Sequence, residues 1–121
     1  MSQIIGVISI HPWLSIEVDA AFDKRIINFL FDTGFEGELA IPKEFMSMFG
    51  TSEDYLSADF ANGRREKAML VTCRIKWGDE DRDVSAMYIN GENPLIGMEL
   101  FSDCVVTLEI QNGQGDITVD F

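Results

Sequence analysis

Hydrophobic and polar residues alternate with a period of two along most of the chain, the spacing that places alternate side chains on one face of a β-strand. One apolar run ends at Ile8 and Ile10, and a second alternates over residues 14–18. His11-Pro12 interrupts the chain between them, because proline lacks the N–H that a strand ladder needs. Residues 25–31 are too continuously apolar for a half-solvated strand, which predicts a central strand covered on both faces. The chain is therefore predicted to be mainly β.

The second half of the chain continues this pattern. Residues 69–77 alternate between apolar and largely polar side chains over one long strand, and Gly78-Asp79 predicts the turn that ends it. Residues 84–88 alternate in a return strand, and residues 106–121 form a last hairpin around Gly113-Gln114-Gly115. These turns recur too often for parallel βαβ units, so we expect a small closed or sandwiched β-barrel.

Three local signals interrupt the strands. Pro42 has the fixed φ that suits a first helical turn, so residues 42–49 are predicted to form a short helix. A second short helix is expected to begin at Met98. Asn62-Gly63 is the strongest hairpin signal, because a type I′ turn needs positive φ at both positions. We expect this dipeptide at the tip of a β-hairpin.

Length and charge narrow the range of functions. With 121 residues, of which 46% are hydrophobic, the chain has the size and composition of one compact domain spanning residues 1–121. Nine Lys and Arg against 21 Asp and Glu give a net charge of -12, which repels nucleic-acid backbones and anionic lipid heads. No apolar stretch approaches the ~20 residues of a membrane span, and the first residues lack the basic region of a secretory signal. We expect neither nucleic acid nor a membrane as a partner, and the cytoplasm as the compartment.

Few side chains outside one segment suggest chemistry. Cys73 and Cys104 stand alone in different segments, which favours reduced structural thiols over a redox or zinc motif. His11, the single histidine, has no cysteine or serine nucleophile in a recognisable setting. The acidic run 79–83 lacks the ligand spacing of a calcium loop and is interpreted as a solvated turn.

The informative segment is Asp32-Thr33-Gly34, which follows the apolar run 25–31 directly. An ionised carboxylate at the end of a buried strand costs desolvation free energy unless it is hydrogen-bonded or shares a proton. Its position there therefore needs an explanation. One reason is structural, because Asp-Thr-Gly also suits a turn that ends a strand. The other is catalytic, and this segment alone does not decide between them.

A second segment changes the interpretation. Residues 94–100, with the sequence PLIGMEL, place two apolar residues before Gly97 and then enter a short helix. The order is an apolar strand, Asp32-Thr33-Gly34, a hairpin, an apolar-apolar-glycine segment, a short helix and final strands. In this order and in these motifs, from about residue 14 to residue 121, the chain resembles the retropepsin-like aspartic proteases, the single-lobe relatives of pepsin. FDTGFEGELAIP and PLIGMELF look like a microbial branch of that clan.

The resemblance implies a mechanism and a set of site residues. Such proteases hydrolyse peptide bonds without metal or cofactor, using a water activated between two carboxylates. A chain with one Asp-Thr-Gly and the length of one lobe then requires a two-fold homodimer, with Asp32 supplied by each subunit. The implied residues are the catalytic Asp32, Thr33 whose hydroxyl braces the partner's loop, Gly34 beside the carboxylates, the supporting Ile96 and Gly97, and the flap residues Asn62 and Gly63.

Two departures from the family keep a second hypothesis open. The expected flap carries Arg64-Arg65-Glu66 in place of several glycines, and Glu99 stands where a shorter Asp or Asn is usual. The leading interpretation is a homodimeric aspartic endopeptidase that acts on peptides or proteins. The alternative is a catalytically silent barrel of the same fold that serves as a dimerisation or peptide-binding module.

Overall fold

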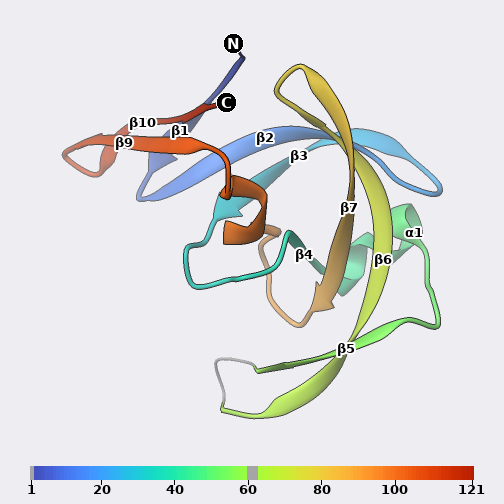
Figure 1. Ribbon diagram of the computed structural model, residues 1–121. Coiled ribbons are helices and arrows are strands. Elements are labelled where there is room, and N and C mark those ends of the chain that lie inside the picture. The colour runs from blue at the N-terminus through green and yellow to red at the C-terminus, as the bar shows by residue number, and fades with distance from the viewer. Residues whose placement is uncertain (1, 60–62) are drawn as a thin grey trace.

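A computed structural model describes residues 2–59 and 63–121, which form ten β-strands and three short helical segments (Figure 1). The mainly β prediction is therefore confirmed. The strands are β1 (Gln3–Ser9), β2 (His11–Asp19), β3 (Lys24–Phe31), β4 (Leu39–Pro42), β5 (Tyr55–Asp59), β6 (Arg65–Trp77), β7 (Glu80–Ile89), β8 (Leu95–Ile96), β9 (Val105–Gln111) and β10 (Gln114–Asp120). The helical segments are the 3-10 turn η1 (Lys43–Phe45), the helix α1 (Met46–Phe49) and the 3-10 helix η2 (Met98–Phe101).

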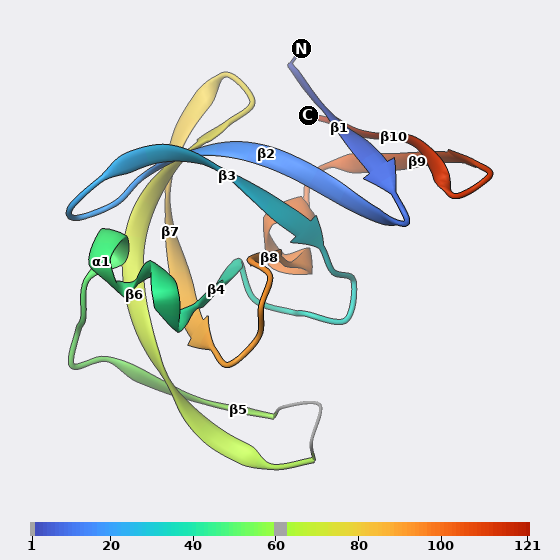
Figure 2. The ribbon, with the colours of Figure 1, turned by 180° about the vertical axis from the view of Figure 1, so that it is seen from behind.

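The strands form one sheet that closes on itself. Their order is β5-β6-β7-β4-β8-β3-β2-β1-β10-β9, and β2 pairs in addition with β6. That extra pairing joins Val18 to Ile75 and Asp19 to Arg74, so β6, β7, β4, β8, β3 and β2 form a ring. The β5–β6 hairpin extends from one end of the ring, and β1, β10 and β9 continue the sheet beyond β2 (Figures 1 and 2). The closed sheet expected from the frequent turns is thus present.

The core is built from side chains that alternate along these strands. Every second residue of β2 from Leu14 to Val18 is at most 2% exposed, as the pattern predicted. The same holds for β6, where Val71, Cys73, Ile75 and Trp77 are buried. Burying one such side chain contributes roughly 1.5–3 kcal/mol, so this alternation is what holds the ring together.

The prediction that residues 25–31 are covered on both faces is wrong. Ile27, Phe29 and Phe31 of β3 are buried, whereas Ile26 is 67% exposed and Asn28 is exposed. The reason is that the ring has its core on one side of β3 only, so that its side chains face the core and solvent in turn.

The break predicted at His11-Pro12 falls one residue earlier. Ile10 has a φ of 64° and separates β1 from β2, while Pro12 lies within β2 opposite Ile8. Proline fits there because the pairing of β2 with β3 begins only at Trp13, so Pro12 has a partner strand on one side.

The predicted short helices are present with one shifted boundary. Pro42 ends β4 instead of opening a helix, and its φ of -59° goes with an extended ψ of 151°. The helical region is η1 followed by α1, which ends at Phe49 as predicted. The helix predicted at Met98 is confirmed as η2.

The two predicted hairpins are confirmed. β5 pairs with β6 from Tyr55 opposite Met69 to Asp59 opposite Arg65, and Gly63 of the connection has a φ of 79°. Asn62, the other residue expected at this tip, lies outside the described residues.

The last hairpin has its turn slightly earlier than predicted. Asn112 and Gly113 both have positive φ, of 55° and 75°, as a type I′ turn requires. Gln114 and Gly115 already belong to β10. The Asn-Gly pair therefore sets the turn, and the following glycine lies within the strand.

Candidate active site

Asp32 lies at the end of β3, where that strand meets β8. The two strands are parallel neighbours, with Leu30 opposite Leu95 and Phe31 opposite Ile96. The Asp32 N–H donates a hydrogen bond to the Ile96 carbonyl oxygen at 3.1 Å, which continues this pairing one residue beyond the strand. The backbone that carries the carboxylate is therefore tied to the segment that the sequence resemblance marked as its support.

The loop after Asp32 turns back toward its own carboxylate. The Gly34 N–H donates to Asp32 Oδ1 at 2.8 Å, and the Phe35 N–H donates to the Asp32 carbonyl oxygen at 3.2 Å. A Cβ placed on Gly34 would lie 3.2 Å from Oδ1, so glycine allows this close approach. One carboxylate oxygen is thus oriented by a backbone N–H, and Oδ2 accepts no hydrogen bond within the described part of the chain.

Gly97 is where the loop packs on its support. Its N–H donates to the Glu38 carbonyl oxygen at 2.8 Å, and the next N–H, of Met98, donates to the Phe35 carbonyl oxygen at 2.9 Å. A Cβ on Gly97 would lie 2.2 Å from the Gly37 carbonyl oxygen, which is closer than atoms can approach. Ile96 beside it is fully buried. This position therefore requires glycine, and the loop 32–38 and residues 96–98 form one hydrogen-bonded unit.

Thr33 makes no hydrogen bond to that unit through its side chain. It is exposed, and its hydroxyl has no hydrogen-bond partner among residues 2–59 and 63–121. Asp32 is half-buried and Gly34 is exposed, so the carboxylate and both following residues lie at the surface of this chain. The structure brings Asp32, Gly34, Ile96 and Gly97 together and leaves Thr33 open to the surroundings.

A cavity of about 640 Å³ has Gly34 in its lining, and the Gly34 N–H donates to the Asp32 carboxylate. It is lined by residues 34–39 of the loop, by the β5–β6 hairpin, by Ser85 and Met87 of β7, and by Glu99 of η2. The hairpin residues that line it are Leu56, Ser57, Asp59 and Leu70. Gly63 at the hairpin tip is exposed and does not belong to this lining.

These hairpin and strand residues could not be assigned to the site from the sequence. No motif marks Leu56 or Leu70, because their position beside residues 34–39 depends on how β5, β6 and β7 pair across the sheet.

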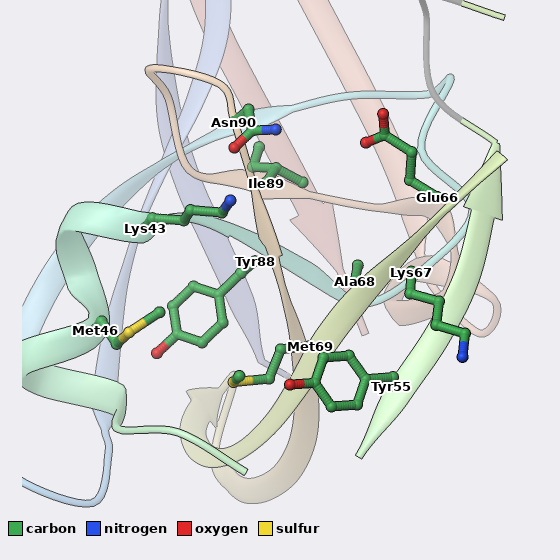
Figure 3. A pocket seen from close by; sticks show the side chains of 10 residues that line it. All are labelled: Lys43, Met46, Tyr55, Glu66, Lys67, Ala68, Met69, Tyr88, Ile89 and Asn90. Carbon is green, nitrogen blue, oxygen red and sulfur yellow. The ribbon is translucent and has the colours of Figure 1, made fainter. Parts of the chain in front are cut away.

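A second, smaller cavity of about 300 Å³ lies between the β5–β6 hairpin, the end of β7 and η1 (Figure 3). Tyr55, Met69 and Tyr88 line it, and the Tyr88 hydroxyl donates a hydrogen bond to the Gly50 carbonyl oxygen. Burial raises the pKa of this tyrosine. No residue of the loop 32–38 lines this cavity, so it is separate from the carboxylate.

The described residues hold neither a candidate metal site nor a candidate membrane-spanning helix. Among residues 2–59 and 63–121, no three His, Cys, Asp or Glu side chains gather as a metal site would require. Over the same residues, no helix has the length and the apolar character needed to cross a membrane.

Comparisons with solved structures identify the fold. A retropepsin-like aspartic protease from Rickettsia conorii superimposes with a TM-score of 0.63 and 20% sequence identity, over 97% of this chain and 93% of that chain. EIAV protease complexed with the inhibitor HBY-793 gives a TM-score of 0.61 and 12% identity, over 77% of this chain and 86% of that chain. No protein-family model matches the sequence, and no curated protein does. The chain has the fold of the retropepsin-like aspartic proteases, as its motifs implied.

Proposed function

We propose that this protein is an aspartic endopeptidase that acts as a homodimer, with one Asp32 carboxylate from each subunit. The observation that carries the proposal is the hydrogen-bonded unit of the Asp32 loop and residues 96–98, placed within a retropepsin-like fold. The Gly34 N–H bond to Asp32 Oδ1 is an Asx-turn, which ordinary strand ends also use. The support for a site therefore comes from the packing of Gly97 against the Gly37 carbonyl oxygen within this fold.

The chemistry divides between two carboxylates. One acts as a base toward a water molecule while the other, protonated, donates to the carbonyl oxygen of the peptide bond. The Gly34 N–H holds Oδ1 of each Asp32 and leaves Oδ2 for the water or for the second carboxylate. Each chain supplies one Asp-Thr-Gly, so the complete site needs two subunits.

Exposed residues near Asp32 and on the β9–β10 hairpin support a dimer. The exposed Thr33 hydroxyl is available to the partner's loop, the role that the family resemblance implies for it. The β9–β10 hairpin projects toward the same side of the molecule as the loop 32–38 (Figure 1). Its edge strand β9 carries Leu108 and Ile110, which are 45% and 61% exposed. A second copy that met this side would cover these side chains and bring two Asp32 loops together.

The decisive experiment replaces the carboxylate and keeps its shape. Asp32→Asn retains an oxygen for the Gly34 N–H but cannot take part in proton transfer, so cleavage of a peptide library should fall by at least about 10²-fold. Mass spectrometry of the products measures the cleavage, and circular dichroism checks that the variant is folded. Unchanged cleavage in the variant means that Asp32 is not the catalytic group. An unmutated protein that binds peptides and cleaves none is the silent module of the alternative hypothesis.

A further inference from the structure

We infer that the cavity beside Asp32 selects peptides with a basic side chain, lysine or arginine, close to the bond that is cut. This inference rests on the proposed function, because it names the substrate class of that same site. Gly34 lines this cavity and its N–H donates to the Asp32 carboxylate, so a peptide lying across Asp32 can place a side chain in the cavity.

The charges around the cavity have one sign. Glu36, Glu38, Asp59 and Glu99 line it, and none of its described lining residues is Lys, Arg or His. Asp59 lies opposite Arg65 in the β5–β6 register. The three glutamates form no ion pair with any residue of the described chain.

Glu38 is held in place as a partner for a cation. Its Oε1 accepts a hydrogen bond from the Ser85 N–H at 2.9 Å, and its own carbonyl oxygen accepts one from Gly97 at 2.8 Å. The side chain is half-buried, and Oε2 has no partner within the described chain. A carboxylate fixed in this way loses little conformational freedom when it binds an ammonium or guanidinium group.

The rest of the cavity suits the aliphatic part of the same side chains. Leu39 is 1% exposed, and Leu56, Leu70 and Met87 line the cavity with it. Lys and Arg carry three or four methylene groups below the charge, and such stems lie along apolar surface while the charged end reaches polar groups. An apolar lining with a few fixed carboxylates therefore matches both ends of a basic side chain.

The charge of the whole chain acts in the same direction. A net charge of -12 attracts cationic peptides and repels anionic ones, which raises the rate of encounter with the former at low ionic strength. This long-range effect does not depend on position in the peptide, whereas the effect of the cavity does. The two can therefore be separated by experiment.

The test measures binding without cleavage. Eight-residue fluorescent peptides carry one Lys, Gln or Glu at a position that moves along an uncharged host, and fluorescence anisotropy with the Asp32→Asn protein gives the dissociation constants. We expect Lys to bind about tenfold more tightly than Gln at one or two positions and Glu to bind more weakly than Gln. The preference for Lys should shrink in 0.5 M salt, because charges more than about 5 Å apart are then largely screened from one another. Equal binding of Lys and Gln at every position overturns the inference.

Matched variants separate the cavity from the bulk charge. Glu38→Gln and Glu99→Gln each remove one cavity charge, and the new amide oxygen of the first can still accept from Ser85. Glu80→Gln makes the same change in net charge at an exposed position of β7 outside the cavity lining. We expect the first two to reduce the preference for Lys at least threefold and the third to keep it. An equal reduction in all three overturns the inference, because bulk charge then explains the preference.

Cleavage by the unmutated protein distinguishes the two proposals. Cleavage of the same peptides with kcat/KM independent of charge contradicts the basic preference and supports the peptidase. Selective binding of Lys peptides without cleavage contradicts the peptidase and supports the assignment of the cavity.

Discussion

At the scale of single residues, the candidate site depends on close contacts at two glycines. Gly34 lies within the loop 32–38 beside the Asp32 carboxylate, and Gly97 packs against this loop at the Gly37 carbonyl oxygen. The contact at Gly97 is with backbone, which cannot turn aside as a side chain can. The position of the carboxylate therefore depends on a residue that carries no chemistry of its own.

We predict that Gly97→Ala lowers the free energy of unfolding by about 1–3 kcal/mol, because the loop must move to accept the methyl group. Peptide cleavage should fall with it. Chemical denaturation measures the first effect. Gly91→Ala is the control, since a Cβ at this exposed position meets only the flexible end of Ile89, at 3.2 Å. Equal losses in the two variants would show that Gly97 has no special packing role.

Cys73 provides a prediction about pH. Burial, reinforced by the charges of Glu38 and Asp83, raises the pKa of its thiol to about 12 from a usual value of 9.0. The unfolded chain loses this proton at lower pH than the folded one, so the thiol's contribution to stability is complete below pH 9.0 and is lost as pH rises toward 12. Thermal unfolding of the unmutated protein should therefore shift to lower temperature over this range by more than that of Cys73→Ala. Parallel curves would contradict the raised pKa.

At the scale of elements, the long strand β6 connects the ring to the candidate cleft. Its 13 residues pair with β5 over Arg65 to Met69 and with β7 over Leu70 to Trp77. The N-terminal part of β6 therefore belongs to the hairpin that covers the cavity, and the C-terminal part belongs to the core. Because one strand serves both, the hairpin is held over the Asp32 loop by the packing of the ring.

The β9–β10 hairpin provides a prediction about assembly. Leu108 and Ile110 lie opposite Ile117 and Gly115 and so share the face of β9 that is directed to the core side, while Val105 lies on the other face. We predict that Leu108→Lys or Ile110→Lys weakens the dimer at least about tenfold, because a charge would be buried between subunits. Val105→Lys, at a position 66% exposed, is the matched control. Sedimentation equilibrium measures the association, and a dimer equally strong in all three variants would place the interface elsewhere.

At the scale of the whole molecule, the net charge of the chain opposes its association into the proposed two-fold dimer. In the proposed dimer each subunit would carry -12, so two subunits would repel at long range even where their contact surfaces are complementary. Such a dimer would form only if apolar contact exceeded that repulsion.

We predict that the dimer strengthens as salt is added, because screening shortens the range of repulsion from about 10 Å at 0.1 M to about 3 Å at 1 M. Analytical ultracentrifugation over this range should show the dissociation constant falling. A dissociation constant that rises with salt would mean that attractive ion pairs hold the interface. A monomer at all concentrations would contradict the homodimer and, with it, the complete catalytic site.

The sequence by itself determined the features that depend on neighbours along the chain. The period of two identified the strands of residues 14–18 and 69–77 and the faces that they bury. The glycines at 63 and 113 marked turns because few other residues adopt positive φ. Asp32-Thr33-Gly34 and Ile96-Gly97 could be recognised as a pair because each is a short run of distinctive residues.

The features that depend on which strands pair with one another could be established only from the tertiary structure. The apolar run 25–31 has the composition of a strand buried on both faces, yet Ile26 faces solvent because the ring covers one side of β3. The lining of the cavity includes Glu38, Leu56 and Glu99, which come from three distant segments of the chain. No local sequence pattern predicts that these residues lie together. The ring is closed by the pairing of β2 with β6 at two positions only, Val18 opposite Ile75 and Asp19 opposite Arg74. Local preferences act over a few residues, whereas long-range pairing is settled by the packing of all strands at once.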